Sequence, residues 1–84
     1  MNVEQIKSLV NQVSENFDFG KYETRLLTRY YVHKYCKWLT QVAIAKEFGV
    51  SKDNVCLGLK TVEKDSRYAI MKLRIDQVIK SHLQ

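Results

Sequence analysis

The sequence contains no proline and only three glycines, Gly20, Gly49 and Gly58, among its 84 residues. Sheets of short strands need turn residues about every 8 to 12 positions, so this scarcity excludes an all-β fold. No apolar run approaches the roughly 20 residues of a membrane span, and the N-terminus lacks the basic start and apolar stretch of a signal peptide. We therefore expect a cytoplasmic protein that does not associate with a membrane.

Cysteine is also scarce, with only Cys36 and Cys56. Two cysteines in a chain of this type are expected to be reduced and buried. With His33 and His82 they would make four zinc ligands, but the sequence has no Cys-x-x-Cys pair and distributes the four residues over three expected helices. The sequence therefore predicts neither a metal nor another cofactor.

The shortness of the chain predicts a single domain, residues 1–84. Folding a chain of this size buries only about 60 to 65% of its unfolded surface, which leaves little room for a deep substrate cavity. The sequence also has no Gly-rich phosphate loop and no marked set of serine, histidine and acid. We expect a protein without enzymatic activity.

Acidic residues are few in most of the chain. There are 14 Lys and Arg against 9 Asp and Glu, a net charge of +5. Residues 1–20 hold one of the basic and three of the acidic residues, so residues 21–84 hold 13 and 6, a net charge of +7. Such an excess is typical of a domain that binds a polyanion.

Hydrophobic periodicity predicts an all-α fold of about five helices. Residues 1–19 form the first, an amphipathic helix, because their apolar residues recur at steps of three and four, and Asn2 and Gln5 have the spacing of a capping box. We expect Gly20 to end this helix in the left-handed conformation. Its apolar face is predicted to comprise Val3, Ile6, Val10, Val13 and Phe17.

Two further segments have the pattern of long, largely buried helices. A central helix is expected from about Tyr22 to Trp38, with Leu27, Tyr31, Tyr35 and Trp38 facing the core. A C-terminal helix is expected over residues 66–83, opened by a cap at Asp65 and Ser66. Its inward face is predicted to comprise Tyr68, Met71, Ile75 and Val78.

Residues 41–63 have the pattern of a helix-turn-helix, with Thr40 and Ser51 as the N-caps of its two helices. Ala45 is small where the helices would cross, and Gly49 suits a turn with positive φ. Val50 and Val55 would fill the wedge between the helices, and Gly58 would allow another close approach. The alternative is a helical hairpin with a glycine turn and no role in binding.

If the second helix begins at Ser51, its outward face would enter a DNA groove. Asn54 would pair with adenine, Lys52 would contact a phosphate or guanine, and Leu57 would pack on a thymine methyl group. Asp53 is expected to cap the helix N-terminus, since an acid on this face would repel DNA. The residues expected to contact DNA here are Ser51, Lys52, Asn54, Leu57, Lys60 and Lys64, the last two through phosphates.

Two arginines near the start of the central helix, Arg25 and Arg29, lie one turn apart. A guanidinium there can bind a phosphate or enter a minor groove, so both are candidate DNA contacts. The lysines farther along this helix are expected to lie on a solvated outer face.

The order of these segments resembles the C-terminal DNA-binding domain of the bacterial chromosomal replication initiator DnaA. Residues 39–49 look like the family's first reading helix ending in Phe-Gly, and residues 67–83 look like its closing helix. The family's signature Asp-His-Thr-Thr-Val falls on residues 51–55, where only Val55 is kept. The resemblance implies a Trp-repressor-like helix-turn-helix that binds double-stranded DNA, with the family's minor-groove arginine at Arg25 or Arg29.

A helix-turn-helix fold can also be kept while its surface binds a protein. Asp53 and Leu57 on the reading face, and the apolar outer edge formed by Ile70 and Leu73, favour that alternative. Two functions therefore stay open. The first is double-stranded DNA binding in replication or regulation, in a bacterium or phage. The second is a protein-interaction module, with self-association through the C-terminal helix as one form.

Overall fold

The computed structural model describes residues 1–17 and 19–83. It contains five α-helices and one short 3-10 helix, in the order α1 (Val3–Glu15), α2 (Lys21–Tyr35), α3 (Gln41–Phe48), α4 (Lys52–Lys64), η1 (Ser66–Tyr68) and α5 (Ala69–Leu83). The predicted all-α fold with about five helices is confirmed.

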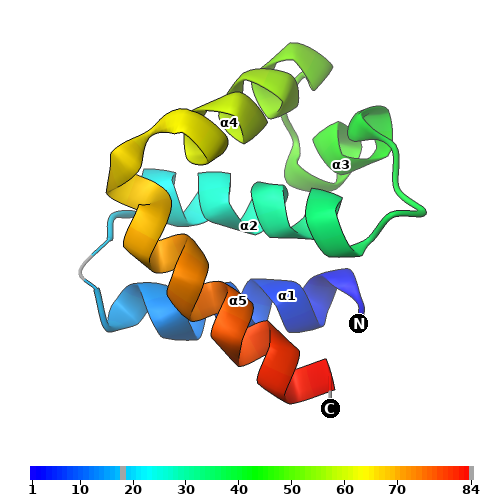
Figure 1. Ribbon diagram of the computed structural model, residues 1–84. Coiled ribbons are helices and arrows are strands. Elements are labelled where there is room, and N and C mark those ends of the chain that lie inside the picture. The colour runs from blue at the N-terminus through cyan, green and yellow to red at the C-terminus, as the bar shows by residue number, and fades with distance from the viewer. Residues whose placement is uncertain (18, 84) are drawn as a thin grey trace.

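Helix α2 runs through the middle of the molecule, with α1 on one side and α4 on the other (Figure 1). Helix α3 packs against α4 and against α2, and α5 packs against α1. The short 3-10 helix η1 turns the chain from α4 into α5. The described part of the chain thus has α3 and α4 on one side of α2 and places α1 on the other.

The core lies where α1, α2 and α5 meet. Ile6, Leu27, Tyr31 and Ile75 have no exposed surface at all. The Tyr31 hydroxyl donates a hydrogen bond of 2.9 Å to the carbonyl oxygen of Lys72, so a buried polar group is satisfied and α2 is fixed to α5. Burial, followed by the nearby carboxylate of Asp76, raises the pKa of Tyr31 well above its ordinary value.

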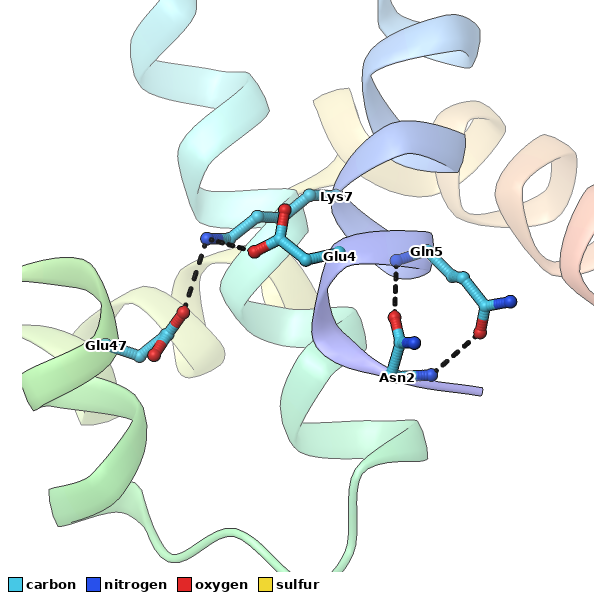
Figure 2. Close-up of polar contacts among 5 residues, drawn as sticks. All are labelled: Asn2, Glu4, Gln5, Lys7 and Glu47. Atoms are coloured by element: carbon cyan, nitrogen blue, oxygen red, sulfur yellow. Dashed lines mark hydrogen bonds and ion pairs between the residues drawn. The ribbon is translucent and has the colours of Figure 1, made fainter.

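The helices begin where their capping residues predict. Asn2 and Gln5 form a reciprocal capping box at the start of α1, in which each side chain accepts a hydrogen bond of 2.9 Å from the other residue's backbone N–H (Figure 2). Thr40 caps α3, and Ser51 caps α4. Asp65 caps η1, where its carboxylate accepts a hydrogen bond of 2.9 Å from the N–H of Arg67.

The junction of α1 and α2 differs from the prediction. Helix α1 ends at Glu15 and not at residue 19, and Asp18 lies outside the described residues. Gly20 is not a left-handed stop, because it has φ −72° and serves as the N-cap of α2. The side chain of Glu23 folds back toward Gly20, and a Cβ at Gly20 would lie 2.7 Å from its Oε2 atom.

The C-terminal end of α2 also differs, because the helix stops at Tyr35 and not at Trp38. Trp38 lies in the loop before α3 and is 66% exposed, so its predicted place in the core is wrong. Cys36, the C-cap residue, is buried in its stead. Both cysteines are free, but Cys56 is only half-buried, in contrast to the expectation that both are buried.

The segment predicted as one helix over 66–83 is a 3-10 turn followed by α5. Three of the predicted inward residues, Tyr68, Met71 and Ile75, are buried, whereas Val78 is only partly buried and Ile79 completes the apolar face. Within residues 1–17 and 19–83, none of the helices combines the length and apolar character that crossing a bilayer requires.

Candidate nucleic-acid interface

The turn between α3 and α4 has the geometry that the helix-turn-helix pattern predicts. Gly49 has φ 67° and ψ 36°, the left-handed conformation that favours glycine. The N–H of Val50 donates to the carbonyl oxygen of Ala45 at 2.9 Å, and the N–H of Gly49 donates to that of Lys46 at 3.3 Å. These two bonds form a Schellman motif, which ends α3 and directs the chain into α4.

Small residues let the helices approach closely. Ala45 is buried in α3, and Val55 is buried in α4. Gly58 faces α2, where an added Cβ would lie 3.0 Å from Cδ2 of Leu26, closer than side chains ordinarily pack. Glycine at this position therefore sets how closely α4 lies on α2.

One face of α4 stays in solvent. Leu57 is 67% exposed. The Ser51 hydroxyl accepts a hydrogen bond of 3.1 Å from the N–H of Asn54, so it serves the helix cap, and the exposed Asp53 lies in the first turn. The predicted contact residues exposed along α4 are Ser51, Lys52, Asn54, Leu57, Lys60 and Lys64.

The lysines of α4 have no acidic partner within the described residues. Ion pairs there join Lys7 to Glu4 and Glu47, Lys34 to Asp76, and Arg67 to Asp65. None of these pairs includes a lysine of α4, so the three lysine side chains of this helix are not held in ion pairs with the described residues. Such charge is available to an anionic ligand.

The two arginines of α2 differ in their surroundings. Arg25 is exposed and lines a hollow beside α1 with Asn11 and Ser14. Arg29 is only 6% exposed, and its guanidinium lies against α4 near Gly58. Burial lowers the pKa of Arg29 below its ordinary value. Arg29 therefore does not lie on an open surface of α2, and Arg25 is the arginine on α2 that solvent reaches.

A hollow lies between the first half of α2 and the outer side of α4. Its lining includes Tyr22 and Leu26 from α2 and Asn54, Leu57, Gly58 and Thr61 from α4, with Ser51 and Asp53 at one end. Tyr22 is 65% exposed and was not among the predicted contacts. Tyr22 precedes Leu26 by four residues and Arg29 by seven, so the three side chains lie along the same face of α2, the face toward α4. This spacing is the signal in the sequence that could have identified Tyr22.

Helix α3 also makes side-chain contacts with α1. Nζ of Lys7 on α1 lies 3.5 Å from the carboxylate of Glu47 and 3.4 Å from that of Glu4 (Figure 2). The same Nζ lies 5.0 Å from the centre of the Phe48 ring. These contacts orient the first helix of the motif relative to α1.

The residues weighed as metal ligands do not form a site. Across residues 1–17 and 19–83, no group of three or more His, Cys, Asp or Glu side chains is placed to hold a metal ion. Burial raises the pKa of the Cys36 thiol, which keeps it protonated and unreactive.

Comparisons with protein-family models, with curated proteins and with solved structures found no match to this chain.

Proposed function

We propose that this protein binds double-stranded DNA through α3 and α4 and catalyses no reaction. The observation that supports this most is the exposed face of α4. Its three lysines form no ion pair with any residue that the structure describes, and the helix follows a Schellman turn with a left-handed glycine. The resemblance to the DnaA domain suggests a role in replication or regulation, and such a role requires a cytoplasmic location.

The residues of α4 would act in different ways. Asn54 lies in the first turn of α4, where a recognition helix meets base edges, and its amide can bind adenine in the major groove. Leu57 would contact a thymine methyl group. Lys52, Lys60 and Lys64 would bind phosphates, and Arg25 would reach the backbone or minor groove from α2. Phosphate contacts set affinity, and base contacts set sequence preference.

The proposal is tested by titrating the protein with random-sequence duplex DNA over a range of salt concentrations. We expect weak binding at physiological salt and much tighter binding at low salt, because binding releases the counterions condensed on the phosphates. Absence of binding at low ionic strength would contradict the proposal.

Two substitutions separate base contacts from phosphate contacts. Asn54→Ala should change the sequences selected from a randomised duplex pool, whereas Lys60→Ala should weaken binding to all sequences about equally. Lys80→Ala is the matched control, because Lys80 is an exposed lysine in the last turn of α5. If Asn54→Ala leaves both affinity and sequence preference intact, α4 does not lie in the groove as described.

A protein partner is the second candidate function, supported by the outer edge of α5. Ile70 is 66% exposed and Leu73 is 65% exposed, one turn apart on the same helix. Self-association through this edge would appear as a concentration-dependent mass in sedimentation experiments, and Leu73→Glu should abolish it. A constant monomer mass would exclude self-association and leave a different protein as the partner.

A further inference from the structure

Arg29 is a buried cation that has no counter-ion among residues 1–17 and 19–83. The residue is 6% exposed, and its buried Nε atom has no hydrogen-bond acceptor in that part of the chain. No ion pair among the described residues includes it. An arginine stays charged at neutral pH even when burial lowers its pKa, so the folded protein holds an unneutralised charge between α2 and α4.

The position of this charge is set by Gly58. A Cβ built at Gly58 would lie 3.9 Å from Nη2 of Arg29 and 3.0 Å from Cδ2 of Leu26. Both Leu26 and Gly58 line the hollow between α2 and α4. Nη2 of Arg29 therefore lies next to Gly58, one of the residues that line the hollow.

Burial of a charge without a counter-ion costs free energy, and a hydrogen-bonded anion would recover it. The polar groups around the hollow include donors for an anion, the hydroxyls of Tyr22 and Ser51 and the amide of Asn54, whereas the Thr61 hydroxyl already donates to the carbonyl oxygen of Leu57 at 2.9 Å. Asp53, at one end of the hollow, disfavours an anion close to itself. The opposite end, toward Thr61, is the better place for a negative group.

We propose that the hollow between α2 and α4 binds an oxyanion paired with Arg29, and that this oxyanion is a backbone phosphate of bound DNA. The inference rests on the proposed function, because the lysines on the exposed face of the same helix favour a polyanion over a single acidic side chain. Tyr22 lies beside this phosphate and becomes a further contact residue.

The test compares the parent with Arg29→Met and Arg29→Lys. Methionine keeps much of the side-chain length and removes the charge, and lysine keeps the charge. Each phosphate contact contributes about −0.9 to the slope of log Kobs against log salt, so Arg29→Met should flatten that slope by about one. Arg29→Lys should keep the parent slope, and Lys80→Met, which removes a charge on α5, should also keep it.

Stability separates this role from a structural one. Removal of an unpaired buried charge should leave the melting temperature of Arg29→Met equal to or above that of the parent. The salt slope decides the result, since a merely structural arginine would change the melting temperature and leave the slope as it is. An unchanged slope in Arg29→Met overturns the proposal.

A second measurement does not depend on DNA. At matched ionic strength, inorganic phosphate should raise the melting temperature of the parent more than that of Arg29→Met. If the parent binds no duplex yet shows this difference, the oxyanion site stands and the proposed function fails. If an oligo-glutamate peptide gives the difference and inorganic phosphate does not, the assignment to a DNA phosphate is overturned in favour of an acidic protein partner.

Discussion

The scaffold of α1, α2 and α5 and the helix-turn-helix unit of α3 and α4 differ in how their residues are used. The scaffold and η1 supply most of the large, fully buried side chains, whereas α3 and α4 supply only Ile44, Val55 and Val62. The helix-turn-helix unit instead exposes the lysines of α4 and the side chain of Leu57 to solvent. We therefore expect stability to depend mainly on the scaffold and the proposed DNA binding to depend on the unit, and substitutions should separate the two.

The largest effect on stability is expected from the scaffold. Ile75→Ala removes a side chain with 0% exposure and leaves a cavity, so the free energy of unfolding should fall by about 2 to 5 kcal/mol in chemical denaturation. Ile70→Ala is the matched control, because Ile70 is 66% exposed on the same helix and its loss should cost less than about 0.5 kcal/mol. Equal losses would show that α5 is packed differently.

The turn of the helix-turn-helix unit should give the next largest effect. Gly49→Val forces a β-branched residue to φ 67°, which should cost about 1 kcal/mol or more and tilt α4 against α3. DNA affinity should fall with it. Thermal melting and duplex titration measure the two effects.

Gly20→Val provides the control for that substitution. Gly20 has an ordinary negative φ, and an added Cβ would meet only the flexible carboxylate end of Glu23. This variant should bind DNA as the parent does as long as it is folded. If Gly49→Val is as stable and as tightly bound as the parent, residues 41–63 do not function as a helix-turn-helix.

The local features of this fold were predictable from sequence because they depend on neighbouring residues. The caps at Asn2, Thr40, Ser51 and Asp65 follow from side chains that bond to backbone N–H groups two or three positions away. The left-handed Gly49 follows from the apolar pattern on both sides of it. The exposure of the predicted contact residues on α4 was predictable for the same reason, because the helical period of neighbouring residues sets which side chains face away from the core.

The predictions that differ from the structure concern packing between segments that are distant in the sequence. A spacing of four residues turns a side chain by about 40° around a helix, and that angle separates Arg25 beside α1 from Arg29 beneath α4. Nothing near Trp38 shows that α2 ends three residues earlier. Gly20 was expected to end one helix and instead begins the next, because glycine is suited to either position.

The two N-caps of the unit sharpen the comparison further. Ser51→Ala and Thr40→Ala each remove a side-chain oxygen that accepts a hydrogen bond of 3.1 Å from a backbone N–H, so each should cost about 1 kcal/mol of stability. Only Ser51 lies at the start of α4, the helix whose exposed face is proposed to contact DNA. We therefore expect equal shifts in denaturation but a larger loss of DNA affinity for Ser51→Ala, and equal affinities would place Ser51 away from the DNA.

The smallest effect on stability is expected from the ion pair that links two helices of the scaffold. Nζ of Lys34 on α2 lies 3.2 Å from a carboxylate oxygen of Asp76 on α5, and the two side chains are 44% and 25% exposed. Burial alone would lower the pKa of Lys34, but the hydrogen bond and charge of Asp76 outweigh it, and the pKa lies above its ordinary value. Solvent screens such a pair, so Lys34→Met should cost only about 0.5 kcal/mol.

The contribution of the raised lysine pKa is complete below the pKa of an unfolded lysine, near 10.4, and is lost as the pH rises through the folded value. The difference in unfolding free energy between the parent and Lys34→Met should therefore be constant near neutral pH and shrink in alkaline buffer and in high salt. A double-mutant cycle with Asp76→Asn measures the pair itself, and a coupling that does not respond to salt would show that Lys34 acts through packing on Tyr31 and Tyr35 and not through its charge.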